Sequence, residues 1–186
     1  MDASEQRRTI GLILFIATEV MFFAGLLSSY WVLRAQVGAW PPLGQPRLPH
    51  AVTGLNTLIL IGSAFAIARA RYRRGEEAAS ESVLGWLGLA TLTGLLFLSI
   101  QGYEWIRLLH FGLTAVANIY GGFFYLVVGA HAVHVVIALG ILAFVTYRAR
   151  RGYYSASSQS GLRLCRIYWI FVVLLWPFIY VALYLS

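Results

Sequence analysis

Three ionisable side chains stand inside long apolar runs of this sequence, where they could bind or transfer a proton. Glu19 lies in the run 9–33, about 15 Å from its start if the run is a helix rising about 1.5 Å per residue. It is the only acidic residue at that depth, and burial disfavours the charged form of a carboxyl group. We therefore expect Glu19 to be largely protonated. Two interpretations stay open: a neutral carboxyl bonded to a neighbouring helix or a lipid headgroup, or a group active in proton or ligand traffic.

The histidines favour hydrogen bonding between helices over metal or haem ligation. His131 and His134 are three residues apart in the run 118–147, so they share one face of a helix and could reach Glu19 across a helix interface. A catalytic zinc or non-haem iron site needs a third protein ligand, and Cys165 is the only cysteine. Haem held between two helices needs histidines at matched depth, whereas His50 and His110 lie at the outer ends of their runs.

The elements that must position these groups are membrane-spanning helices. Of the 186 residues, 60% are hydrophobic and 11% are charged, a composition too apolar for an ordinary soluble domain. Crossing the hydrocarbon core takes roughly 20 apolar residues in a helix. Five runs meet this requirement and predict an all-α integral membrane protein, a single transmembrane domain over residues 1–186: about 9–33, 48–68, 82–103, 118–147 and 167–185. The first run is longer than a signal-peptide core, so we expect it to be retained.

The arginines predict the orientation of the five-helix bundle. All 14 basic residues are arginine and gather between the spans, which indicates membrane orientation and argues against a nucleic-acid partner despite the net charge of +7. One side has only Arg34, Arg47 and Arg107. The positive-inside rule then places the N-terminus in the cytoplasm and the C-terminus outside. The arginines after the second span are also candidate contacts for anionic lipid headgroups: Arg69, Arg71, Arg73 and Arg74.

Polar, aromatic and small residues near the spans complete the prediction. Glu104 follows the third span at the outer interface, where we expect a solvated carboxylate and keep a functional role open. Aromatic residues mark both interfaces, among them Trp169 on the inner side and Tyr184 on the outer side. Glycines within or beside the spans let helices approach closely: Gly85, Gly88, Gly94, Gly121, Gly122, Gly129 and Gly140.

Five sequence stretches follow one another along the five runs. They are TEVMFFAGLLSSYW (18–31), LNTLIL (55–60), QGYEW (101–105), YGGFFYLVVGAHAVHV (120–135) and YWIFVVLLWPFIYVALY (168–184). In this order they resemble the successive signature stretches of cytochrome c oxidase subunit III, and they cover all five runs. Longer members of that family have seven helices, and this chain is similar to the shorter, five-helix bacterial form.

The resemblance implies a non-catalytic accessory subunit of a haem-copper terminal oxidase in a bacterial plasma (inner) membrane. It implies that the haems and copper belong to partner subunits and that the chain binds no cofactor of its own, apart from phospholipid. The implied partners are catalytic subunit I, subunit II and other members of the complex, together with membrane lipids. The implied roles are support of proton uptake at the cytoplasmic side and protection of the active site from inactivation during turnover.

The resemblance also assigns counterparts to the candidate residues. Glu19 matches the family's carbodiimide-reactive carboxyl, which lies beside tightly bound phospholipids and a proposed oxygen route. His131 and His134 match the family's H-x-x-H, and Glu104 matches the Glu of its Q-x-x-E-Y stretch. The last span departs from the family, whose His and Asp are replaced here, and Asn118 replaces the usual Asp before the fourth span. The two replacements in the last span are Ile170 and Val173.

Two other functions remain open. One is the related five-helix subunit of a nitric oxide reductase or of a quinol oxidase, although Glu19 in place of Asp favours the cytochrome c branch. The other is a small proton-coupled transporter with Glu19 as its coupling site. Such transporters commonly contain inverted repeats, and five spans do not divide into two equal halves.

Overall fold

The structure, a computed structural model, describes residues 3–37, 40–42, 44–70, 81–154 and 159–185. These residues form five α-helices and, within the described ranges, no strand: α1 (Ala3–Gln36), α2 (His50–Arg69), α3 (Glu81–His110), α4 (Ile119–Arg150) and α5 (Ser160–Tyr184). Each helix is long and apolar enough to cross a membrane. A helix suits this solvent because it satisfies its backbone hydrogen bonds internally. The predicted all-α membrane fold with five spanning helices is confirmed.

The helices extend beyond the apolar runs that predicted them. α1 begins at Ala3 rather than near residue 9, α3 continues to His110 rather than residue 103, and α5 begins at Ser160 rather than residue 167. Hydropathy detects the part of a helix that crosses hydrocarbon, whereas the helix itself continues into the interfacial layer with polar residues. The extension of α3 matters for function because it places Glu104 inside a helix.

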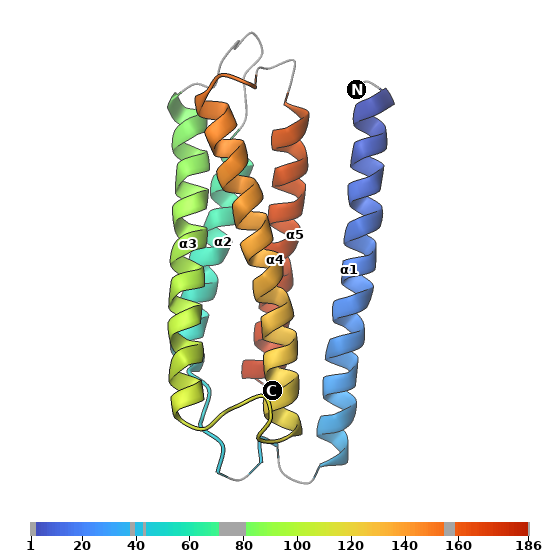
Figure 1. The fold of residues 1–186 in the computed structure, drawn as a ribbon, viewed down its shortest axis with the longest axis vertical. Coiled ribbons are helices and arrows are strands. Elements are labelled where there is room, and N and C mark those ends of the chain that lie inside the picture. Colours follow the sequence, from blue (N-terminus) through green and yellow to red (C-terminus); the bar gives the residue numbers. More distant parts are fainter. Residues whose placement is uncertain (1–2, 38–39, 43, 71–80, 155–158, 186) are drawn as a thin grey trace.

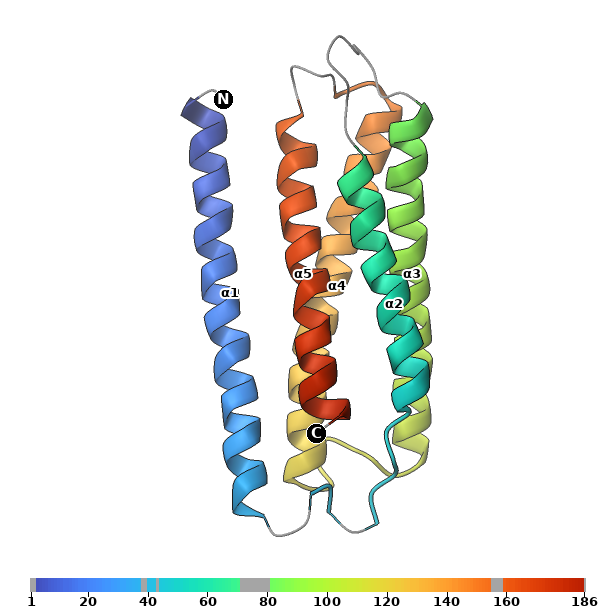
Figure 2. The same ribbon diagram turned by 180° about the vertical axis from the view of Figure 1, so that it is seen from behind.

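Helices α2 to α5 form a packed group, and α1 stands to one side of it. Figure 1 shows α1 beside α4 and α5, and the reverse view in Figure 2 shows that α2 and α3 lie on the far side of the group. Helix α1 contacts only α4 and α5 among the described helices. Its buried residues are Phe23 and Tyr30, whereas most of its other side chains face outward. This loose attachment leaves the surfaces on either side of α1 open.

Helix α5 packs against α4, α2 and α1, and it is hydrogen-bonded to α2 from Arg166 to Tyr180. Four α5 side chains donate to α2 or its C-terminal end: Trp169 Nε1 to Ser63 Oγ (3.0 Å), Trp176 Nε1 to Thr57 Oγ1 (2.9 Å), the Tyr180 hydroxyl to the His50 carbonyl (2.9 Å) and Arg166 Nη2 to the Ala70 carbonyl. Trp169 is therefore buried between helices, and so is Tyr184, whose hydroxyl accepts a hydrogen bond from Gln101 Nε2 of α3 at 3.1 Å. The prediction that they mark the lipid interfaces is wrong, because their polar atoms find partners inside the protein.

Only some of the glycines serve close packing. A Cβ atom on Gly94 of α3 would lie 2.7 Å from Trp169 of α5 and 3.0 Å from Leu139 of α4. A Cβ on Gly121 would lie 2.2 Å from the carbonyl oxygen of Thr114, at the turn into α4. The packing interpretation is wrong for the members of the predicted set that have open space around a Cβ: Gly85, Gly88, Gly129 and Gly140.

The start of α4 has a side-chain cap. The Gly121 backbone N–H donates to Asn118 Oδ1 at 2.8 Å, which satisfies one of the amide groups left unpaired at a helix start. Asn118 therefore performs locally the capping role that an Asp at this position could also perform. This cap fixes the beginning of the helix that carries both candidate histidines.

Candidate functional site

The site is a pair of side chains that joins α1 to α4. Glu19 lies near the middle of α1, and His134 lies near the middle of α4. Glu19 Oε2 is 2.8 Å from His134 Nε2, which is hydrogen-bond distance. The neighbours of Glu19 along α1 include no basic residue, so its partner comes from α4. Of the two histidines that could reach Glu19, the structure selects His134.

The hydrogen bond of the second ring nitrogen of His134, Nδ1, determines how many protons the Glu19–His134 pair carries. His134 Nδ1 lies 2.7 Å from the carbonyl oxygen of Ala130, one turn earlier on α4. A carbonyl oxygen only accepts, so Nδ1 carries a hydrogen and donates it. The bond between Nε2 and Oε2 then needs one further proton, carried either by the carboxyl group or by the imidazole. In both arrangements the pair has zero net charge, which is the condition for stability in a medium that penalises isolated charge.

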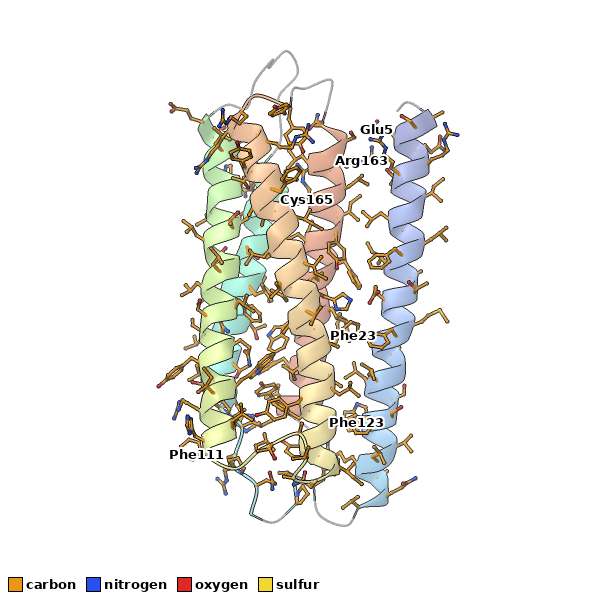
Figure 3. The ribbon with its side chains drawn as sticks, viewed as in Figure 1. Glu5, Phe23, Phe111, Phe123, Arg163 and Cys165 are labelled. Atoms are coloured by element: carbon orange, nitrogen blue, oxygen red, sulfur yellow. The ribbon has the colours of Figure 1, made fainter. Side chains whose placement is uncertain are left out.

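Aromatic packing fixes the imidazole of His134 from one side. The Phe23 ring lies 5.3 Å from the His134 ring at an interplanar angle of 71°, an edge-to-face arrangement. Phe23 is fully buried on the face of α1 turned toward α4 and α5, where Figure 3 labels it. The side chains of His134 and Glu19 are 16% and 17% exposed, so the pair also borders the surface. It is thus accessible to a molecule in the surrounding bilayer.

Two apolar grooves flank α1 next to this pair. The first has a volume of about 570 Å³ and lies between α1, α4 and α5, with His134 and Arg148 both in its lining. These two residues are separated along α4 by about 21 Å, at 1.5 Å per residue. The second groove has a volume of about 630 Å³, lies between α1 and α5, and is lined by apolar side chains that include Phe23 and Ile170. Ile170, the replacement for the family's His, therefore keeps the second groove apolar.

Arg148 lines the first groove near the end of α4. Its guanidinium carbon lies 4.8 Å from the ring centre of Tyr153 and 5.7 Å from those of Phe144 and Tyr154, so three rings hold the cation by cation–π contacts. Burial raises the pKa of the Tyr154 phenol, and the adjacent Arg148 acts in the opposite direction. Sequence reasoning counted Arg148 only among the inner-side arginines and did not single it out, although its spacing of fourteen residues from His134 returns close to the same helix face.

His131 is near the pair but is not part of it. Its ring stacks on Trp176 at 5.1 Å and meets the edge of Phe23 at 6.4 Å. The side chain is fully buried on the face of α4 turned toward α3 and α5. The two histidines of the H-x-x-H stretch thus have different surroundings: His134 faces α1 and a groove, and His131 faces the interior.

Glu104 is not the solvated carboxylate that the sequence suggested. It is buried, with 5% of the residue exposed, and its Oε1 accepts a hydrogen bond from Arg107 Nη1 at 3.2 Å. The Arg107 side chain is half exposed. The expectation is wrong because α3 continues for six residues beyond Glu104, which brings Arg107 onto the same face. Glu104 is therefore one partner in an ion pair at the end of α3 opposite the N-terminus of α1.

Of the four arginines predicted to contact lipid headgroups, the structure describes only Arg69. The Arg69 guanidinium lies 6.0 Å from the ring centre of Trp86, a weak cation–π contact that leaves it available to other ligands. Arg71, Arg73 and Arg74 lie outside the described residues. Within the residues that the structure describes, no three His, Cys, Asp or Glu side chains come together as a metal site. The geometry found here is that of a proton-sharing pair beside apolar grooves.

The comparisons with known proteins all indicate the same family. The family model described as Cytochrome c oxidase subunit III matches residues 3–186. The chain is 34% identical to cytochrome c oxidase subunit 3 of Synechocystis sp., over 96% of this chain and 75% of the relative. It is 34% identical to the same subunit of Thermostichus vulcanus, over 96% and 87% of the two chains. It is 32% identical to a probable cytochrome c oxidase subunit 3 of Mycobacterium leprae, over 95% and 86%.

Proposed function

The chain belongs to the cytochrome c oxidase subunit III family, and on that premise we propose that it is the third subunit of a bacterial haem-copper terminal oxidase. Family membership makes it an accessory, non-catalytic part of an oxidoreductase complex. It lies against catalytic subunit I, with subunit II in the same assembly, and those partners hold the haems and copper. The complex resides in the plasma (inner) membrane.

The observation that carries the proposal is the Glu19–His134 pair. The pair holds one proton near the middle of two spanning helices, and it ties the loosely attached α1 to α4. Both properties suit an accessory subunit that supports the catalytic subunit. A bound proton beside the groove supports proton uptake by the complex, and a fixed α1 keeps the two grooves in shape. The His134–Glu19 contact also explains why a costly carboxyl group is present at this depth.

The orientation follows from the arginines at the two ends of the bundle. The start of α1, the end of α2, the end of α4 and the start of α5 lie at one end in Figure 1. These helix ends contain Arg8, Arg69 and Arg148. Glu5 of α1 and Arg163 of α5 lie at this same end in Figure 3. The opposite end has Arg34, Arg47 and Arg107. We assign the arginine-rich end to the cytoplasm on the positive-inside rule.

The first groove is suited to a phospholipid with an anionic headgroup. Its apolar lining accepts an acyl chain alongside α1, and Arg148 supplies a cation at the cytoplasmic end where a phosphate would lie. Arg148 is thereby a stronger headgroup candidate than Arg69, which is not among the residues that line this groove. The bound lipid would lie next to the Glu19–His134 pair and limit access of water to it.

Replacing Glu19 with Gln tests the role of the pair. The amide N–H₂ can still donate to His134 Nε2, so we expect assembly and the haem spectra of the complex to be unchanged. Gln cannot exchange a proton, so we expect slightly slower turnover and faster inactivation during turnover. Glu19→Leu removes the bond entirely and should increase inactivation further. Oxidase activity assays over many turnovers distinguish the variants, and loss of haem from either complex would contradict an accessory role.

Replacing Arg148 with Gln tests the lipid site. A single arginine near an anionic headgroup is worth about 1 kcal/mol, so we expect roughly fivefold weaker retention of anionic phospholipid by the purified complex. Arg150→Gln is the matched control, because it removes the same charge from an exposed residue outside the groove. Mass spectrometry of the retained lipids gives the comparison. Equal lipid loss in both variants would show that total charge, and not the groove, governs binding.

A further inference from the structure

Tyr168 of α5 is a nearly buried tyrosine whose hydroxyl group has no partner in the described part of the chain. The residue is 7% exposed and lies in the lining of the first groove, as does Cys165 one turn earlier, which Figure 3 labels. The hydroxyl makes no hydrogen bond to a described residue, yet it keeps accessible surface, unlike the sealed ring nitrogens of His131. The accessible part of Tyr168 therefore faces the groove.

Aromatic neighbours hold the Tyr168 ring in place. Its centre lies 6.1 Å from that of Phe15 on α1 and 6.4 Å from that of Phe171 on α5. Glu19 is within electrostatic range of Tyr168, but the two side chains make no hydrogen bond, and Glu19 Oε2 is bonded to His134 instead. A hydroxyl group left unpaired in apolar surroundings is costly, so the molecule that fills the groove should offer it an acceptor atom.

The depth of this hydroxyl group follows from the positions of its neighbours along the groove. The Arg148 guanidinium carbon lies 5.7 Å from the ring centre of Tyr154, and a Cβ on Gly161 would lie 2.8 Å from the Tyr154 hydroxyl, so these three residues share one level. Tyr168 follows Gly161 by two turns of α5, about 10 Å deeper. Aromatic side chains point back toward the N-terminus of their helix, which for α5 is the arginine-rich end. The hydroxyl group therefore lies between these two levels.

This depth matches the ester groups of a phospholipid whose phosphate is bound by Arg148. In a diacyl glycerophospholipid each ester carbonyl is only a few bonds from the phosphate, and the headgroup layer is roughly 5–7 Å thick on each side of a bilayer. An ester carbonyl oxygen accepts hydrogen bonds, whereas the acyl chain below it offers no polar atom. A tyrosine suits this level, because its ring is apolar and its hydroxyl group is polar.

We propose that Tyr168 donates its hydroxyl hydrogen to an ester carbonyl of the phospholipid in the first groove. Because this role rests on the proposed lipid site, it adds a chemical class to that site: the groove prefers a diacyl, ester-linked lipid to an ether-linked one. An ether-linked lipid has the same phosphate but no carbonyl group beside it. Arg148 binds the phosphate of both lipids and cannot distinguish them, so the discrimination comes from Tyr168.

Competition between two matched lipids tests the proposal. The complex is purified through this chain, its haem spectrum checks the oxidase assembly separately, and detergent removes its lipid. It then receives equal amounts of diacyl phosphatidylglycerol and the dialkyl ether analogue with the same chain length. We expect mass spectrometry to find roughly fivefold more of the ester lipid retained, the effect of one hydrogen bond. Tyr168→Phe keeps the ring and removes only the hydroxyl group, so this preference should disappear.

Two further variants separate the Tyr168 contact from the rest of the site. Tyr147→Phe removes the hydroxyl group of an exposed tyrosine outside the groove lining and should keep the ester preference. Arg148→Gln should weaken retention of both lipids by a similar factor and also keep the preference. Retention that depends on Arg148 but shows no ester preference would overturn the role of Tyr168 alone. Retention that is independent of Arg148 would overturn the lipid site as well.

Infrared spectroscopy of the intact complex supplies a direct measurement of the bond. The stretching band of a lipid carbonyl labelled with carbon-13 shifts to lower frequency when its oxygen accepts a hydrogen bond. We expect a low-frequency component in the unmodified complex that is reduced in Tyr168→Phe and unchanged in Tyr147→Phe. Equal bands in all three proteins would contradict the hydrogen bond from Tyr168.

Discussion

Replacing Trp176 with alanine should lower the free energy of unfolding of this subunit by about 3 kcal/mol. Trp176 is fully buried, stacks on His131, meets Phe97 edge-to-face at 5.3 Å and donates to Thr57. Removing a buried Trp from a soluble core costs about 3–5 kcal/mol. We expect the lower end of that range, because lipid is as apolar as the interior and the loss is chiefly one of packing and of the Thr57 hydrogen bond.

The single cysteine of the chain provides the measurement. Cys165 is buried in α5, so a maleimide dye should label it only when the subunit opens. Labelling of this chain's gel band in the intact complex, followed against temperature, should shift to lower temperature in Trp176→Ala. Phe65→Ala is the control, since it removes an aromatic side chain that is 69% exposed on α2. Similar shifts in the two variants would contradict the assignment of Trp176 to the packed centre.

Replacing Gly94 with alanine should destabilise the subunit, whereas the same change at Gly88 should not. The new Cβ at Gly94 would lie 2.7 Å from Trp169, whose ring is fully buried and tied to Ser63. Overpacking of this kind costs about 1–3 kcal/mol. Gly88 lies on the same helix with open space around a Cβ, so alanine there should gain up to about 1 kcal/mol from helix propensity.

The same Cys165 labelling assay distinguishes these two glycine variants by the sign of the shift. Gly94→Ala should open at a lower temperature than the unmodified subunit, and Gly88→Ala at the same or a higher temperature. A neutral Gly94→Ala would mean that Trp169 can move aside at little cost, and it would contradict the tight packing of the Trp169 side chain against Gly94.

Much of the fold could be predicted because membrane solvation leaves strong local signals. Hydrocarbon excludes unpaired backbone groups, so long apolar runs had to be helices, and all five were identified. The helical spacing of His131 and His134 placed both on one face, and a bond from that face to Glu19 was foreseen. What local spacing could not decide was which histidine makes the bond, because that depends on how α1 lies against α4.

The errors concern contacts between helices that are distant in sequence. In the sequence Trp169 resembles an interfacial residue. In the structure its indole N–H donates to Ser63 Oγ, which lies far earlier in the chain. The sequence does not distinguish Gly94 from Gly88, whereas in the structure only Gly94 lies next to Trp169. Glu104 seemed solvated because hydropathy ended α3 too early. The grooves beside α1 left no signal at all, because a side chain that faces lipid is as apolar as one that faces a neighbouring helix.

The most direct test of the account is the composition of the assembly that contains this chain. An affinity tag on the chain, gentle solubilisation of the membrane and native mass spectrometry give the subunits and bound haem in one measurement. We expect the chain to be recovered in a complex with haem-bearing oxidase subunits, and to bind no haem or copper when separated from them. Recovery of the chain alone or as a homo-oligomer, or with a metal bound to it, would contradict an accessory role in an oxidase.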